Sequence, residues 1–94
     1  MTQLAGKKTL ITGAGSGIGK ALALLAAEKG ARLVLTDVNA ESLNTVVSDV
    51  RARGGDVLLA RAFVVSDHDA VRSFADELAR EHGSTLVVED RRDV

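Results

Sequence analysis

The chain has 94 residues and a formal net charge of −1, so it has room for one small domain and lacks the basic surface that binds nucleic acid or anionic membranes. It contains no cysteine, which excludes a disulfide framework and a thiolate metal site. A hydrophobic fraction of 46% argues against a disordered chain, and with no stretch typical of a signal peptide or a membrane span we expect a cytoplasmic protein.

A glycine-dense turn at residues 12–19 is the most informative stretch. Residues 7–12 are typical of a buried strand, and residues 17–29 consist largely of strong helix formers. The first turn of a helix has unpaired N–H donors and the positive end of the helix dipole, and glycine lets the backbone approach an anion closely. The turn therefore predicts a phosphate-binding site. The residues expected to line it are Gly13, Gly15, Ser16, Gly17, Ile18 and Gly19.

The spacing of the glycines indicates which class of nucleotide site this is. The P-loop pattern fails because position 14 is not glycine, and G-x-G-x-x-G fails because its third glycine would fall on Ile18. The pattern that fits is Thr-Gly-x-x-x-Gly-x-Gly, on Thr12, Gly13, Gly17 and Gly19. With this turn the chain resembles the short-chain dehydrogenase/reductase family over about residues 6–83. The resemblance implies a Rossmann-type domain whose turn holds the pyrophosphate of a nicotinamide dinucleotide.

The helix after the turn has apolar residues at helical spacing, and we expect these to face the sheet. They are Ile18, Ala21, Leu22, Leu25 and Ala26. Gly30 is a natural C-terminal stop for this helix.

A second strand over residues 32–36 ends in Asp37, 18 residues after Gly19. A carboxylate at this place accepts hydrogen bonds from the ribose hydroxyls and repels a 2′-phosphate, and neither Ser16 nor the adjoining Val38 is basic. The pattern thus favours NAD over NADP, with Val38 beside the cofactor. The alternative is that Asp37 caps the next helix, a role that Asn39 can supply equally well.

The remaining elements complete an α/β fold. A second helix over residues 40–53 has an apolar stripe at i, i+3, i+4 and i+7: Leu43, Val46, Val47 and Val50. Residues 57–65 are expected to form a third strand buried on both faces. A third helix is expected to begin with a capping box from Ser66 to Asp69 and to run to about residue 81. Its expected core residues are Val71, Phe74, Ala75 and Leu78.

The three strands are expected to form a parallel, partial doubly wound sheet in the order 3-2-1 with right-handed crossovers. Residues 85–88 are a candidate fourth strand beside the first, but the charged run at residues 89–93 is typical of a solvated tail. We therefore expect one partial dinucleotide-binding domain in which residues 84–94 diverge from the family as a disordered tail.

The resemblance also implies an adenine contact that this chain alters. In the family the third strand ends in an aspartate that contacts the adenine amino group, whereas this chain has Val64 there. The backbone of Val65 is left to approach the ring.

The sequence contains no tyrosine, so the family's catalytic Tyr-x-x-x-Lys motif is absent. His68 and His82 lie at opposite ends of the third helix and cannot share a site, and the consecutive residues 67–69 do not converge on one metal ion. We expect neither a catalytic residue nor a metal site. The resemblance then implies the NAD(H)-binding portion of an alcohol or ketone oxidoreductase, inactive alone.

Two alternatives remain open from the residues. One is a noncatalytic nucleotide-binding or assembly module, because the first strand would be an exposed edge that invites a second copy unless residues 85–88 pair with it. The other is a methyltransferase-like domain, which also places a carboxylate after its second strand. The full glycine spacing argues against the latter.

Overall fold

The computed structural model describes residues 6–64, 66–82 and 86–89. Strands and helices alternate along the chain: β1 Lys8–Thr12, α1 Gly17–Glu28, β2 Arg32–Asp37, α2 Ala40–Ala52, β3 Asp56–Ala62, α3 His68–His82 and β4 Leu86–Glu89. The strands form one parallel sheet in the order β3-β2-β1-β4. The expected α/β fold and strand order are confirmed.

The fourth strand changes the expected edges of the sheet. β4 pairs with β1 in parallel, from Thr9 beside Leu86 to Thr12 beside Glu89. β1 therefore lies between β2 and β4, and the exposed first-strand edge that motivated self-association is not present. Residues 86–89, which were expected to belong to a tail over residues 84–94, form a strand. The other residues of that expected tail lie outside the described part of the chain.

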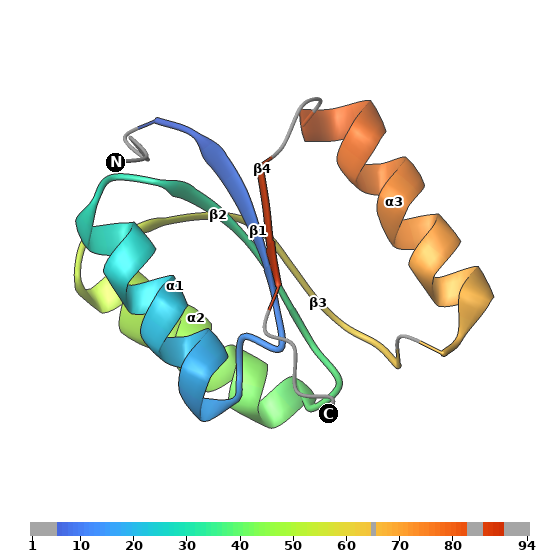
Figure 1. Cartoon of the computed structure of the whole chain (residues 1–94), viewed down its shortest axis with the longest axis horizontal. Coiled ribbons are helices and arrows are strands. Elements are labelled where there is room, and N and C mark those ends of the chain that lie inside the picture. Colours follow the sequence, from blue (N-terminus) through green and yellow to red (C-terminus); the bar gives the residue numbers. More distant parts are fainter. Residues whose placement is uncertain (1–5, 65, 83–85, 90–94) are drawn as a thin grey trace.

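The helices cover the two faces of the sheet unequally. Figure 1 shows α1 and α2 together on one face and α3 on the other. The core under α1 and α2 is extensive, and its buried residues include Ile11, Leu33, Leu35, Leu43, Val46 and Val50. The buried residues under α3 in the described part of the chain are Val34, Leu59 and Phe74. The stripe of α2 is confirmed, with Val47 half-buried.

The rotation of α1 about its axis differs from the expected one. The buried residues are Gly19, Ala23 and Ala26, while Ile18 is 65% exposed and Leu25 50% exposed. Ala21, also expected to face the sheet, is exposed, and Leu22 is half-buried. Because this helix is apolar on nearly every side, periodicity could not fix its rotation. The small residues at i, i+4 and i+7 let its backbone lie close to the sheet, and they set the face that is buried.

β3 and α3 are less buried than the sequence indicated. β3 lies at the edge of the sheet and contributes to the cores on both faces, as expected: Val57 packs under α1 and α2, and Leu59 under α3. The register against β2 shifts between these two residues. The strand is less buried than expected at its end, where Arg61 and Ala62 are exposed. On α3, Phe74 is buried and Leu78 half-buried, whereas Val71 and Ala75 are exposed, against expectation. In the described part of the chain α3 is the one helix on this face (Figure 1), so the flanks of its apolar stripe are left in solvent.

The cap of α3 is also one residue later than expected. The Ala70 N–H donates to the Asp67 side chain at 3.1 Å, and the helix begins at His68. Asp67 is therefore the N-cap, and the predicted capping box from Ser66 to Asp69 is wrong because it needs the helix to start one residue earlier.

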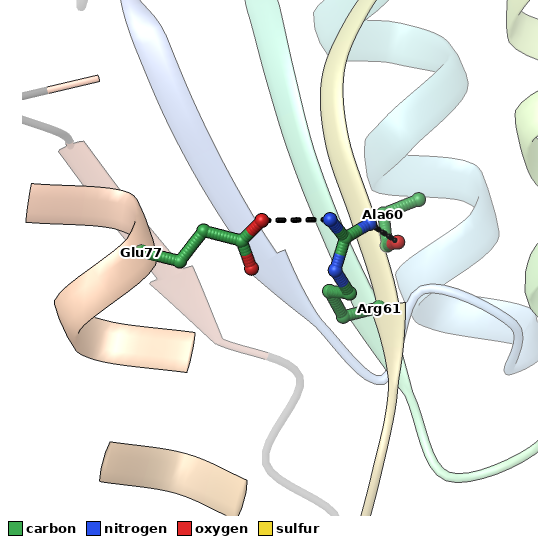
Figure 2. A network of polar contacts seen from close by, with 3 residues as sticks. All are labelled: Ala60, Arg61 and Glu77. Atoms are coloured by element: carbon green, nitrogen blue, oxygen red, sulfur yellow. Dashed lines mark hydrogen bonds and ion pairs between the residues drawn. The ribbon is translucent and has the colours of Figure 1, made fainter. Parts of the chain in front are cut away.

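An ion pair ties α3 to the edge of the sheet. The Arg61 guanidinium donates to Glu77 Oε2 at 2.7 Å and to the neighbouring Ala60 carbonyl at 2.9 Å, as Figure 2 shows. The Glu77 side chain is 22% exposed and that of Arg61 50% exposed, so solvent screens the pair only partly.

We expect this pair to contribute modestly to stability. In a double-mutant cycle with Arg61→Ala and Glu77→Ala, the coupling free energy should be about 0.5–1 kcal/mol, the upper range for exposed pairs. Urea denaturation of the four chains measures it. Strictly additive single effects would contradict the assignment of the pair as a stabilising link.

Candidate cofactor-binding site

The glycine turn lies at the carboxyl end of β1, where the chain passes into α1. Gly13 has a φ of +67°, a backbone conformation that residues other than glycine rarely adopt. The Ser16 amide and hydroxyl both donate to the Gly13 carbonyl, at 3.0 and 2.7 Å, and the hydroxyl oxygen accepts from the Gly19 N–H at 3.2 Å. Ser16 thus closes the turn and is the N-cap of α1.

The two glycines at the start of α1 have different physical roles. A Cβ at Gly19 would lie 1.9 Å from the Gly13 carbonyl oxygen, so glycine is required there for the helix to contact the turn. A Cβ at Gly17 would meet nothing within 4 Å. The space above Gly17 is open, and both Gly17 and Ile18 are exposed.

Unpaired donors face this open space. Within the described ranges, the Gly17 and Ile18 amides, in the first turn of α1, have no protein acceptor. Two such amides, at the positive end of a helix dipole with no side chain in the way, fit a diphosphate. Residues 17 and 18 are therefore the candidate anion-binding part of the site.

The turn is also fastened to the end of β2. The Ala14 N–H donates to the Thr36 carbonyl at 2.9 Å, and the Gly15 N–H donates to Asp37 Oδ2 at 2.7 Å. A Cβ at Gly15 would lie 2.7 Å from the Ser42 Cβ and 3.0 Å from the same carboxylate oxygen, so glycine is required here as well. The roles of Ala14, Thr36 and Ser42 in fastening the turn could not be predicted from the sequence, because no local pattern links residues more than 20 positions apart.

The two roles considered for Asp37 can be separated. Its other oxygen, Oδ1, accepts from the Asn39 N–H at 2.8 Å, while the Asn39 side chain accepts from the Ser42 N–H at 2.9 Å. Asn39 is therefore the N-cap of α2, and Asp37 does not cap that helix. Asp37 is half-buried and contacts the glycine turn through its bond to Gly15.

Exposed apolar side chains adjoin the turn at the same edge of the sheet. The Phe63 N–H donates to the Asp37 carbonyl at 3.0 Å, which joins the segments that follow β2 and β3. Val38 and Val64 come next along these two segments, and both are largely exposed. Val65, the other predicted contact, lies outside the described residues.

Acidic and histidine side chains are the candidate ligands for a metal site. Among the residues that it describes, no three histidine, aspartate or glutamate side chains lie close enough to bind a metal ion. His68 is the first residue of α3, as expected from the sequence. In the same part of the chain, no helix is both long and apolar enough to cross a membrane.

Known proteins share this arrangement. The chain is 37% identical over 87 residues to the short chain dehydrogenase/reductase dpchG of Colletotrichum higginsianum, covering 93% of this chain and 32% of that protein. It is 40% identical over 75 residues to the 7alpha-hydroxysteroid dehydrogenase of Escherichia coli K12, covering 78% of this chain and 29% of the enzyme. The chain thus spans about a third of the length of these relatives.

Solved structures agree. A short chain dehydrogenase/reductase from Burkholderia phymatum in complex with NAD matches with a TM-score of 0.81 at 38% identity, over 93% of this chain and 31% of that one. A metagenomic short-chain oxidoreductase in complex with NADP matches with a TM-score of 0.82 at 34% identity, over 92% of this chain and 39% of that one.

A family model described as short chain dehydrogenase matches residues 7–88. The match passes residue 83, where the sequence analysis ended the resemblance, and takes in most of β4. With the glycine turn, the parallel sheet and these relatives in agreement, this chain belongs to the short-chain dehydrogenase family.

Proposed function

We propose that this chain binds a nicotinamide adenine dinucleotide across the carboxyl ends of β1 and β2. It is then the cofactor-binding portion of an oxidoreductase that interconverts alcohols and ketones. The observation that carries the proposal is the pair of amides at Gly17 and Ile18, which face open space at the start of α1. The diphosphate would be held there, with the ribose near Asp37 and the adenine near Val38 and Val65.

We further propose that the cofactor is NAD. Family membership does not decide the matter, because one matched structure contains NAD and another NADP. Asp37 favours NAD over NADP, because its carboxylate would lie next to a ribose 2′-phosphate and repel it.

The bound cofactor supplies hydride transfer; the residues of this chain hold and orient it. Because the 94 residues contain no tyrosine, we propose binding without turnover for this chain by itself. The alternative named from the sequence, a noncatalytic binding module, would bind a nucleotide in the same turn. It differs from the proposed function only in that no further residues would complete an enzyme.

The test is a titration of the full chain with NADH and NADPH, followed by nicotinamide fluorescence. The chain has neither tryptophan nor tyrosine, so its own emission does not interfere. We expect NADH to bind at least about tenfold more tightly than NADPH, which is the effect of one unfavourable charge pair of roughly 1.4 kcal/mol.

Two further arms sharpen the test. Calorimetry with S-adenosylmethionine separates the methyltransferase-like alternative and should show no heat of binding. Equal affinity for NADH and NADPH would contradict the assigned role of Asp37. Absence of binding by both would overturn the proposed function.

A further inference from the structure

We infer that Asp37 is a positioning residue for the diphosphate, because it holds the glycine turn in its binding shape before any ligand arrives. This role is separate from a contact with the ribose. It rests on the proposed function, since it matters only if the turn receives a dinucleotide.

The contacts of the Asp37 carboxylate carry the inference. Oδ2 accepts from the Gly15 N–H at 2.7 Å, and Oδ1 accepts from the Asn39 N–H at 2.8 Å. Both oxygens are therefore engaged by backbone amides on opposite sides, one in the turn after β1 and one just before α2. A side chain fixed at both oxygens acts as a rigid link between these two segments.

The surroundings of Gly15 show that the link is close-packed. An added Cβ would lie 2.7 Å from the Ser42 Cβ and 3.0 Å from Asp37 Oδ2, so the turn rests directly against the start of α2. The next residue back, Ala14, is bonded to the Thr36 carbonyl at 2.9 Å. The turn is thus tied to β2 at two successive residues, and one of these ties is the Asp37 side chain.

The inference can be tested by whether a change at residue 37 raises or lowers the affinity for a diphosphate. A carboxylate beside an anion site repels the anion, so removing its charge alone should tighten diphosphate binding. Removing the tether should loosen the turn and weaken binding, since the amides of residues 17 and 18 would no longer be held in place. The two effects have opposite directions.

The experiment uses the full chain and 2′,3′-dideoxyadenosine diphosphate, a probe that has the diphosphate but no ribose hydroxyl for Asp37 to contact. Asp37→Ala and Asp37→Asn both lose the charge, so the comparison between them isolates the tether, and we expect Asp37→Ala to bind the probe about tenfold more weakly than Asp37→Asn. Asp37→Asn loses the charge and keeps one acceptor oxygen; with that oxygen on the Gly15 amide the tether to the turn is retained, and the bond lost is the one from the exposed Asn39 N–H.

The matched control is Asp67→Ala. Asp67 also accepts from a backbone amide, that of Ala70 at 3.1 Å, but at the start of α3. It should leave binding of the probe unchanged. If Asp37→Ala does not fold, Asp37→Leu replaces it, because leucine keeps the branched shape and still lacks an acceptor.

A second readout needs no ligand. In the free chain, exchange of the Gly15 amide with deuterium, followed by NMR, should be at least about tenfold faster in Asp37→Ala than in the unmodified chain or Asp37→Asn. Unchanged exchange overturns the inference whatever the ligand result, and so does faster exchange with the probe bound as tightly by Asp37→Ala as by Asp37→Asn. If the unmodified chain binds neither dinucleotide nor probe, the proposed function fails, and Gly15 exchange alone decides the role of Asp37.

Discussion

A Gly19→Ala chain is expected to lose about 3 kcal/mol of unfolding free energy, among the largest effects of any single methyl group in this protein. The added Cβ would lie 1.9 Å from the Gly13 carbonyl oxygen and 3.0 Å from the Ala14 Cα. These are backbone atoms, so no side-chain rotation relieves the overlap and α1 must move away from the turn. The higher helix propensity of alanine recovers only about 0.5–1 kcal/mol. Urea denaturation followed by circular dichroism measures the loss.

Gly17→Ala is the matched control, two residues earlier in the same helix. Its Cβ would meet nothing within 4 Å, so the unfolding free energy should stay the same or rise slightly. The methyl group would, however, occupy the space proposed for the diphosphate, and NADH should bind at least about tenfold more weakly. Equal stability of Gly19→Ala and Gly17→Ala would contradict the close packing of α1 on the turn.

Phe74→Ala should have the second large effect, a loss of about 3 kcal/mol, at the low end for buried phenylalanine because α3 is the one helix that the described residues place on that face. Phe74 is 8% exposed and packs with Val34 and Leu59. Its ring lies 5.2 Å from that of Phe63 at a tilt of 42°, an aromatic contact that is lost with the side chain. Urea denaturation gives the magnitude.

Val71→Ala on the same helix is the control for Phe74→Ala. Val71 is 37% exposed, so its truncation should cost less than about 1 kcal/mol. Amide exchange should show faster opening of α3 in Phe74→Ala, with α1 and α2 little affected. A loss spread equally over all three helices would argue against α3 as a separately packed layer.

The local features of the fold could be predicted from sequence. The strand–turn–helix at residues 8–28, the sheet order and the stripe of α2 all follow from patterns that residues near one another in the chain specify. Asn39 was recognised as able to cap α2 because its position before an apolar stripe is a local signal.

What could not be predicted depends on contacts between distant residues. The rotation of α1 is set by the contact of Gly19 with Gly13, because its own sequence is apolar on nearly all sides. The exposure of β3 depends on its place at the edge of the sheet, and that of Val71 depends on α3 having no helix beside it in the described part of the chain. In the candidate site, the sequence identified Asp37 but not its bond to Gly15, since these residues are 22 positions apart.

The unequal covering of the two sheet faces separates the thinly packed α3 from the part of the molecule proposed to bind the cofactor. The hydrogen bonds that fasten Ala14 and Gly15 of the glycine turn go to Thr36 and Asp37, at the end of β2. A sub-global opening that releases α3 would therefore leave the turn assembled. Fluctuations on that face would change the protein's susceptibility to proteolysis without changing its affinity for a dinucleotide.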